Sequence, residues 1–336
     1  MIKKVILVIL SIIVLVVVFI VIYVQTSWDK NYADWPGPSL KASTDSAVIA
    51  RGKYLVYGPA HCSSCHVASF DDLVAGDQGK QIDLKGGLRF PMGPLGAMYT
   101  RNLTPDASTG IGRYTDEQLF RMMRHGIRPN GQASMPVLMP FWKMADDDLV
   151  AVVSYLRSIA PVENNVPENE WTFMGKAVRA LTPTFKPIED PAAPTVAPAM
   201  APTIERGEYL ARYVTNCVGC HTQRDLMTYQ ATAPEFAGGM EFEPWPEFYT
   251  YLKSDPAAWI RTPNITPDPE SALSRYKTPE EFVARFRKGR LVNFSPMDWG
   301  PFSRMSDEDI TAIWMYLNSL DPVKKDVGEL VFKKGG

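Results

Sequence analysis

The chain has 336 residues, a formal net charge of −2 and 21% charged residues. This balance excludes functions that depend on a strongly basic surface, such as nucleic-acid binding. The length is sufficient for two domains of ordinary size, and only four histidines are present, which leaves little scope for metal sites built from several imidazoles.

The first feature of the chain is an apolar segment over residues 5–24. As a helix of about 20 residues at ~1.5 Å each, it matches the hydrocarbon thickness of a bilayer. Lysines precede it, and Trp28 and Tyr32 follow it, which favours a cytoplasmic N-terminus. A cleaved signal peptide is the alternative, but no small-residue cleavage motif follows the segment. We therefore predict a single-pass anchor over residues 1–27 in a bacterial inner membrane, with the remaining chain on the periplasmic side.

The pentapeptide Cys-x-x-Cys-His occurs twice and contains all four cysteines of the chain. Its members are Cys62, Cys65, His66, Cys217, Cys220 and His221. The spacing lets two thiols bind the vinyl groups of one haem, while the imidazole that follows binds the iron. Zinc would need the two Cys pairs to meet although about 150 residues separate them, and a thioredoxin-like dithiol would need a βαβ context. We predict two covalently attached haem c groups, with His66 and His221 as iron ligands.

After the anchor, one unit occurs twice, over residues 45–160 and 203–322. Both copies contain, in the same order, Arg-Gly-x-Tyr-Leu, the haem motif, Gly-Gly, Asn-x-Thr-Pro-Asp and an acidic turn before a final apolar helix. In the final helices, over residues 146–156 and 307–317, apolar side chains recur with the helical period. No long alternating β pattern appears. The fold class that we predict is mainly α, with two tandem domains after a transmembrane helix.

The two units are separated by residues 161–202 and followed by a tail over 323–336. We predict a short helix over 170–181. Residues 187–202 are rich in Pro and Ala, which is typical of an extended, semi-rigid linker. We expect this linker to set the spacing of the two haem domains.

Each iron needs a second axial ligand or an open position, and a methionine sulfur closes the site to substrates. In the second unit we predict Met297 as that ligand. The first unit offers Met135 and Met139. Counted back from the tyrosine of the final helix, Met135 matches Met297 within one residue, so Met135 is preferred and Met139 is the alternative.

Asn102 and Asn264 begin the repeated Asn-x-Thr-Pro-Asp segments. This composition is typical of turns. Contact with a haem propionate is the second role that we predict for both residues.

These motifs together resemble the class I c-type cytochromes. The resemblance is strongest to the membrane-bound multihaem cytochrome subunits of alcohol and gluconate dehydrogenases. It implies a helical fold around each haem, thioether links from the four cysteines, proximal histidines and distal methionines. Those subunits carry three haem units, whereas this chain has two, and its anchor is N-terminal.

The expected function is therefore the relay of single electrons in a periplasmic respiratory chain, between a dehydrogenase or quinol-oxidising complex and a terminal acceptor. We expect an electron carrier rather than an enzyme, with redox proteins as partners. Two alternatives remain: a peroxidase-like dihaem enzyme, and a fixed cytochrome subunit of a larger oxidoreductase. Segments 70–99 and 222–261 exceed what a minimal haem domain needs and are candidate partner surfaces or lids. The second is rich in large aromatic residues: Trp245, Phe248, Tyr249, Tyr251 and Trp259.

Overall fold

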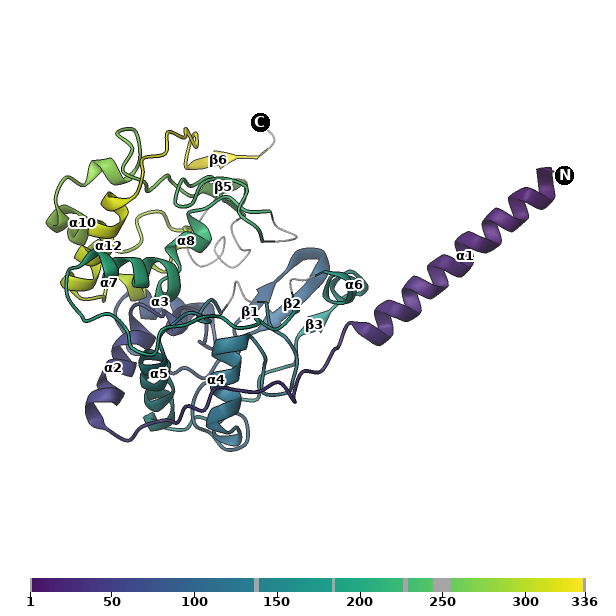
Figure 1. Ribbon diagram of the computed structural model, residues 1–336, viewed down its shortest axis with the longest axis horizontal. Coiled ribbons are helices and arrows are strands. Elements are labelled where there is room, and N and C mark those ends of the chain that lie inside the picture. Colours follow the sequence, from purple (N-terminus) through teal and green to yellow (C-terminus); the bar gives the residue numbers. More distant parts are fainter. Residues whose placement is uncertain (1, 136–138, 183–184, 226–228, 244–254, 335–336) are drawn as a thin grey trace.

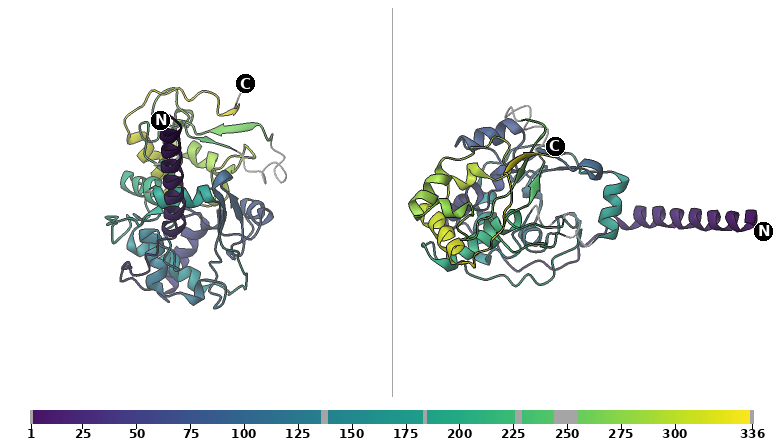
Figure 2. Two further views of the ribbon diagram at one scale, coloured as in Figure 1. Left: turned by 90° about the vertical axis from the view of Figure 1, so that its right-hand side faces the viewer. Right: turned by 90° about the horizontal axis from the view of Figure 1, so that it is seen from above.

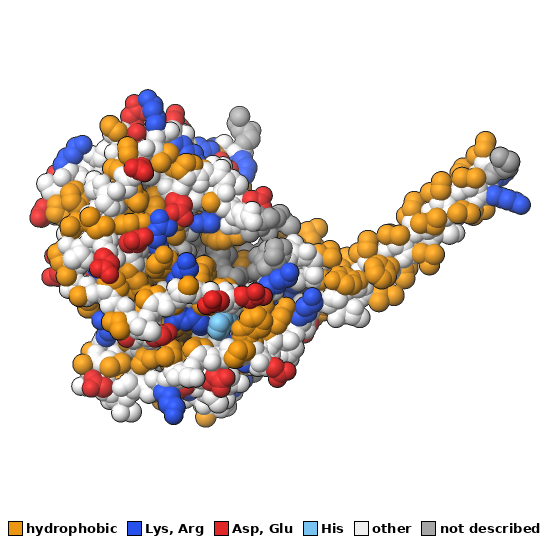
Figure 3. Space-filling view, in the orientation of Figure 1, with side chains coloured by type: hydrophobic (Ala, Val, Ile, Leu, Met, Phe, Trp, Pro, Cys, Tyr) orange, Lys and Arg blue, Asp and Glu red, His pale blue; other side chains and the backbone are white. Residues whose placement is uncertain are grey.

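The computed structural model describes residues 2–135, 139–182, 185–225, 229–243 and 255–334. Helix α1 (Ile2–Ser27) extends away from a compact head formed by the rest of the chain (Figure 1). Within the described residues it is the one helix long and apolar enough to cross a membrane. Figure 3 shows apolar side chains along its whole visible length.

In the head, both segments predicted as units are mainly helical. The first comprises α2 (Ser46–Tyr57), α3 (Phe70–Asp77), α4 (Asp116–His125) and α5 (Asp146–Ser158). The second comprises α7 (Ile204–Tyr209), which continues as a π-helical turn over Leu210–Val214, and then α8 (Cys217–Cys220), α10 (Pro279–Arg287), α11 (Trp299–Phe302) and α12 (Asp307–Ser319). The predicted helical class is thus confirmed.

Local capping explains where several helices begin. The Thr115 side chain accepts a hydrogen bond from the Gln118 backbone, and the Gln118 side chain accepts one in return from the Thr115 backbone. The Ser306 hydroxyl accepts a bond from the Asp309 backbone at the start of α12. Helix α4 ends at His125 and is capped by Gly126, whose φ of 68° suits a residue without a Cβ atom.

In each unit the first and last helices cross at a glycine. A Cβ atom on Gly52 of α2 would lie 1.9 Å from the Ala151 carbonyl oxygen of α5. A Cβ atom on Gly207 of α7 would lie 1.9 Å from the Ala312 carbonyl oxygen of α12. The glycine of the repeated Arg-Gly-x-Tyr-Leu motif is therefore required for this close backbone approach.

Each unit also has a small antiparallel sheet that the sequence pattern did not predict. In the first, β1 (Arg89–Pro91) pairs with β2 (Gly96–Tyr99), which pairs with β3 (Glu170–Trp171). In the second, β4 (Glu241–Phe242) pairs with β5 (Ala258–Arg261), which pairs with β6 (Val331–Lys333). The third strand of each sheet comes from the chain beyond the final helix, so parts of the linker and of the tail belong to the units they follow.

The linker also contains α6 (Phe173–Leu181), within the range predicted for a helix. Of the long segments suggested as partner surfaces, 70–99 forms α3 and the β1–β2 hairpin. Trp245, Phe248, Tyr249 and Tyr251 lie outside the described residues. Trp259 lies in β5, where the Lys334 Nζ atom is 3.8 Å from the centre of its ring.

The two units share one continuous hydrophobic core. Leu55 and Leu149 of the first unit belong to the same buried cluster as Leu210 and Ile310 of the second, and each is at most 1% exposed. The expectation that the linker sets the spacing of the units was wrong. Burial of apolar surface between the units holds them in direct contact, and that contact sets the spacing.

Candidate haem sites

The two Cys-x-x-Cys-His segments adopt matching tight turns. The residue before each turn has a left-handed backbone, with φ of 42° at His61 and 53° at Asn216. The His66 backbone then donates a 3.0 Å hydrogen bond to the Cys62 carbonyl, and the His221 backbone donates a 2.8 Å bond to the Cys217 carbonyl. In both units the imidazole therefore follows the first cysteine by one helical turn.

Both imidazoles have one nitrogen held by a backbone carbonyl. Nδ1 of His66 lies 2.8 Å from the Arg101 carbonyl oxygen, and Nδ1 of His221 lies 3.0 Å from that of Pro263. A carbonyl oxygen only accepts hydrogen bonds, so Nδ1 carries the proton and Nε2 keeps its lone pair. Burial is the main cause that lowers the pKa of both rings, and this favours the neutral form. A neutral imidazole with a free Nε2 is the form that binds iron.

The repeated glycine pairs close the proximal side of each site. The Gly86 backbone donates to the His66 carbonyl at 3.1 Å, and the Gly238 backbone donates to the His221 carbonyl at 2.8 Å. Both glycines have positive φ. A Cβ atom on Gly86 would lie 2.4 Å from the Arg101 carbonyl carbon, and one on Gly238 would lie 2.4 Å from that of Pro263. These glycines, with the Arg101 and Pro263 carbonyls, are the site features that sequence reasoning missed. The repetition of Gly-Gly in both units was the available signal.

None of the four cysteines forms a disulfide; Cys62, Cys65 and Cys217 are partly buried, and Cys220 is exposed. Desolvation by neighbouring protein atoms raises the pKa of Cys62 to about 12 and that of Cys220 to about 12, and it also raises the pKa of Cys65 and Cys217. A reactive redox dithiol needs a lowered thiol pKa, so this environment disfavours that alternative. No cluster of three or more His, Cys, Asp or Glu side chains suited to a metal ion occurs among the described residues, and the two Cys pairs thus form no shared zinc site.

One carboxylate connects the two sites electrostatically. After burial, the negative charge of Asp298 is the next cause that raises the pKa of Cys65 in the first unit and of Cys220 in the second. Asp298 also lies 3.7 Å from Nε2 of His61, measured from its Oδ2 atom. The His61 ring packs edge-on against Phe302 of the second unit, with centroids 5.4 Å apart. The two attachment segments are therefore neighbours across the contact between the units.

The candidate distal methionines differ in their packing. Met297 and Met139 are half-buried and pack against the shared core that Cys62 and Cys217 also border. Met135 is half-buried but, in the described part of the chain, is not among the side chains on that core. Residues 136–138 between the two first-unit candidates lie outside the described residues. The count back from the tyrosine of the final helix favours Met135, whereas packing against the shared core favours Met139. Both residues therefore stay candidates.

Asn102 and Asn264 are buried and support the loop that holds the proximal imidazole. Each directly follows the residue whose carbonyl faces that ring, and each accepts hydrogen bonds from a threonine two positions on. The Asn102 side chain also donates to the Val162 carbonyl at 2.8 Å, and Asn264 donates to that of Val323 at 2.8 Å. The predicted turn role therefore agrees with the structure, while contact of either residue with a haem propionate stays a prediction.

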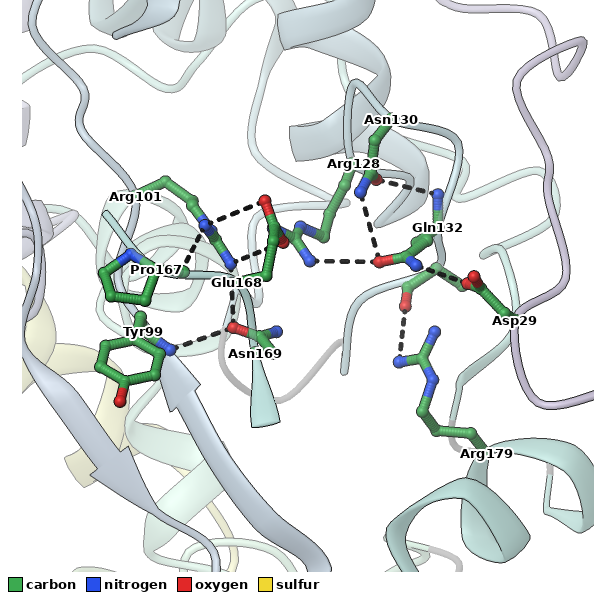
Figure 4. A network of polar contacts seen from close by, with 11 residues as sticks. Asp29, Tyr99, Arg101, Arg128, Asn130, Gln132, Pro167, Glu168, Asn169 and Arg179 are labelled. Carbon is green, nitrogen blue, oxygen red and sulfur yellow. Dashed lines mark hydrogen bonds and ion pairs between the residues drawn. The ribbon is translucent and has the colours of Figure 1, made fainter. Parts of the chain in front are cut away.

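A polar network surrounds the first proximal loop (Figure 4). The Arg101 guanidinium donates to the Pro167 carbonyl, to Glu168 and to Asn169. Its Nε atom and the hydroxyl of Ser63, within the first haem motif, are two of the three buried side-chain nitrogen or oxygen atoms that lack a hydrogen-bond partner among the described residues. One of these atoms lies within the first haem motif and the other on the residue whose carbonyl holds the His66 ring, and buried donors without a protein partner fit a cofactor that carries carboxylate groups, as haem does.

Comparison with known proteins agrees with this chemistry. No protein-family model matches the chain. The chain is 30% identical over 304 residues to the cytochrome c subunit of a quinone alcohol dehydrogenase from Gluconacetobacter polyoxogenes, with 86% of this chain and 59% of that protein covered. It is a homologue of dehydrogenase cytochrome c subunits.

Two further relatives extend the comparison. The gluconate 2-dehydrogenase cytochrome c subunit of Pantoea cypripedii is 30% identical, with 86% of this chain and 62% of that protein covered. A diheme cytochrome c-type protein of Cereibacter sphaeroides is 25% identical, with 80% of this chain and 85% of that protein covered. The chain spans about three fifths of the length of the dehydrogenase subunits that it matches. The resemblance inferred from the motifs is confirmed, and cytochrome c homology implies haem as the cofactor.

Proposed function

We propose that this protein is a membrane-anchored dihaem cytochrome c that relays single electrons on the periplasmic side of a bacterial inner membrane. The observation that carries the proposal is the matched proximal geometry. In both units a Cys-x-x-Cys-His turn presents an imidazole whose Nδ1 proton is held by a backbone carbonyl. Homology to dehydrogenase cytochrome c subunits supports the same conclusion.

In this proposal a covalently bound haem c supplies reversible one-electron chemistry in each unit. Cys62, Cys65, Cys217 and Cys220 form the thioether links. His66 and His221 would bind the two irons, and the Arg101 and Pro263 carbonyls fix the orientation of the two rings. Met297 and one of Met135 and Met139 would supply the second ligand to each iron. Iron that is held by two protein ligands and buried would change little between oxidation states, which suits a relay.

We further propose that the two units are tandem domains of the class I cytochrome c type and that electrons pass directly between them. The shared core and the His61–Phe302 contact support this, because they keep the attachment segments together. One haem would receive the electron and the other would release it. Docking of external partners is expected to be weak and brief, as in other redox encounters.

A second candidate is a fixed cytochrome subunit of a larger complex. The printed names of the alcohol and gluconate dehydrogenase relatives favour it, since both are subunits. Under this candidate the electron donor is a membrane-bound dehydrogenase bound to the head. Gentle solubilisation of native membranes followed by size separation distinguishes the two: a relay migrates alone, whereas a fixed subunit migrates with its dehydrogenase.

Absorption spectroscopy of the full-length protein in detergent tests the proposal. We expect two c-type haems per chain, a methionine–Fe(III) band from each, and no spectral change on adding carbon monoxide or peroxide. The matched double substitutions Cys62→Ala with Cys65→Ala and Cys217→Ala with Cys220→Ala should each leave one haem. A haem that lacks the methionine band and binds carbon monoxide would overturn the relay in favour of a peroxidase-like enzyme.

A further inference from the structure

Helix α6 presents an apolar face to solvent beside the base of α1. Phe173, Met174 and Leu181 are 47%, 54% and 61% exposed. Met174 follows Phe173 by one position and Leu181 follows it by eight, so at about 100° per residue the three side chains lie within one side of the helix. A contiguous group of large apolar side chains that is exposed on a folded protein is typical of a surface that contacts another protein or a membrane.

The opposite face of α6 is fixed to the first unit. The Thr172 hydroxyl donates a 2.6 Å hydrogen bond to the Pro94 carbonyl and accepts one from the Gly175 backbone. A Cβ atom on Gly175 would lie 2.1 Å from the Leu95 carbonyl oxygen, so the helix lies directly on the β1–β2 hairpin. The apolar face cannot turn inward without breaking this contact.

The same helix is bound to the end of α1. The Lys176 Nζ atom lies 4.9 Å from the centre of the Trp28 ring and 3.5 Å from the Gln25 side-chain oxygen. Arg179 is buried and donates to the Trp28 carbonyl at 3.3 Å. Figure 2 shows that α6 runs across the direction of α1 at its base. If α1 crosses a bilayer, α6 lies at the level of the interface and along its plane.

We propose that α6 is an interfacial membrane helix, with Phe173, Met174 and Leu181 in the outer leaflet of the bilayer that α1 spans. The inference rests on the membrane-anchored part of the proposed function. The bilayer is the occupant that continuity with α1 selects, because the apolar face begins where the transmembrane helix ends. Amphipathic helices bind such interfaces through a buried apolar face and flanking basic residues.

The surroundings of α6 have the chemistry of a membrane interface. Trp28 and Trp171 lie beside it, and tryptophan is favoured at the level of lipid headgroups. Lys30 and Lys186 lie around the small cavity next to Arg179. The nearby acidic groups Asp29 and Glu170 already have partners: Asp29 accepts a hydrogen bond from Gln132, and Glu170, next to Trp171, pairs with Arg89. The basic groups suit phospholipid phosphates.

The contact would set the orientation of the haem head, because one helix alone allows the head to tilt and two attachments do not. Polar contacts continue from this base toward the first haem site (Figure 4). Arg179 donates to the Ala133 carbonyl, Arg128 donates to Gln132, and Arg128 pairs with Glu168, which also binds Arg101. Since the Arg101 carbonyl holds the His66 ring, the first site is connected to the membrane surface by a chain of contacts.

Photolabelling of the full-length haem protein in phosphatidylcholine–phosphatidylglycerol vesicles tests this. A photoreactive group on the lipid tails is activated, and labelled residues are mapped by mass spectrometry. We expect label within residues 2–27 and on Phe173, Met174 and Leu181, but not on Leu291 or Val331, which are exposed apolar residues elsewhere. Label within 2–27 but not on α6 overturns this inference and leaves the anchor intact. An unlabelled 2–27 overturns the anchor itself.

A matched pair of variants provides the control. Phe173→Ser, Met174→Ser and Leu181→Ser together should reduce labelling of α6 to the level of Leu291, while α1 keeps its label and both haems keep their spectra. The control Leu291→Ser with Val331→Ser should leave the labelling of α6 unchanged. Persistent labelling of α6 in the triple variant would show that its exposed apolar face does not determine the contact.

Discussion

The hydroxyl of Tyr54, in the first helix of one unit, donates a 2.7 Å hydrogen bond to the carboxylate of Asp309, at the start of the last helix of the other. The reverse contact is also present, because the Tyr209 hydroxyl donates a 2.7 Å bond to Asp148. Both carboxylates are fully buried. The two units are therefore joined by the same contact made twice, as in a two-fold symmetric dimer.

Each carboxylate is also paired within its own unit. Arg51 binds Asp148 at 2.5 Å, and Arg206 binds Asp309 at 2.8 Å. Arginine, glycine and tyrosine of the repeated Arg-Gly-x-Tyr-Leu motif thus have separate roles: the arginine neutralises the carboxylate, the glycine permits the helix crossing, and the tyrosine reaches the partner unit. A buried charge needs such partners to avoid a large desolvation penalty.

Removal of one tyrosine hydroxyl should weaken the contact between the units. We expect Tyr54→Phe and Tyr209→Phe each to lower the free energy of unfolding by about 1–3 kcal/mol, because a hydrogen bond to a buried carboxylate is lost. Chemical denaturation measures the change. Tyr213→Phe is the control, since this tyrosine contacts Tyr209 edge-on but takes no part in the Tyr–Asp pairs. Equal effects of all three substitutions would contradict the assignment.

The helix crossings should not tolerate a methyl group. Gly52→Ala and Gly207→Ala would each force backbone movement, and we expect a loss of roughly 1–3 kcal/mol or more in the free energy of unfolding. Gly76→Ala in α3 is the matched control, because its Cβ atom would meet only the Ile82 side chain, at 3.3 Å. The control should change stability by less than about 1 kcal/mol. Thermal unfolding is followed with the haem spectrum. A larger loss of stability in Gly52→Ala and Gly207→Ala than in Gly76→Ala would show that the close helix crossing, and not glycine replacement in general, is the cause.

The methionine–Fe(III) absorption band should identify the distal ligands. Met297→Ala is expected to remove the band of one haem. In the first unit, one of Met135→Ala and Met139→Ala should remove the band of the other haem and leave carbon monoxide free to bind there, while the second substitution leaves both bands in place. Retention of both bands in all three variants would show that methionine ligates neither iron.

Acid should remove a local contribution of Asp106 to stability. Hydrogen bonds from the backbone and side chain of Thr109, followed by those from Ser108, lower the Asp106 pKa to about 2. A lowered pKa means that the folded state favours the charged form, so the contribution is present above about pH 4 and is lost as the pH falls toward 2. Asp106→Asn should therefore destabilise the protein at neutral pH.

Denaturation midpoints of the native protein and Asp106→Asn, measured between pH 2 and 6, should converge at the acid end. Glu163→Gln, at an exposed carboxylate, is the control and should show no such convergence. A difference between native protein and Asp106→Asn that is independent of pH would rule out the carboxylate charge as the cause.

The sequence by itself determined the chemistry and the repeat of this protein. Haem attachment depends on residues within one short turn, so its signature is local, as are the apolar length of α1 and the capping signals of α4 and α12. The long apolar helix and the mainly helical class could therefore be predicted, and the same local signature makes His66 and His221 the predicted iron ligands. The Gly-Gly and Arg-Gly-x-Tyr-Leu repeats were visible too, although their roles were not.

Only the tertiary structure decided what those repeats do and how the units meet. The acceptors of the proximal rings are backbone carbonyls, which have no side-chain signature. The strands β3 and β6 are two and three residues long, and their pairing depends on distant partners. The contact of Tyr54 with Asp309 joins residues 255 positions apart, through packing that no local period encodes. The direct contact of the units, in place of a linker-set spacing, follows from the apolar surface that each unit leaves for the other.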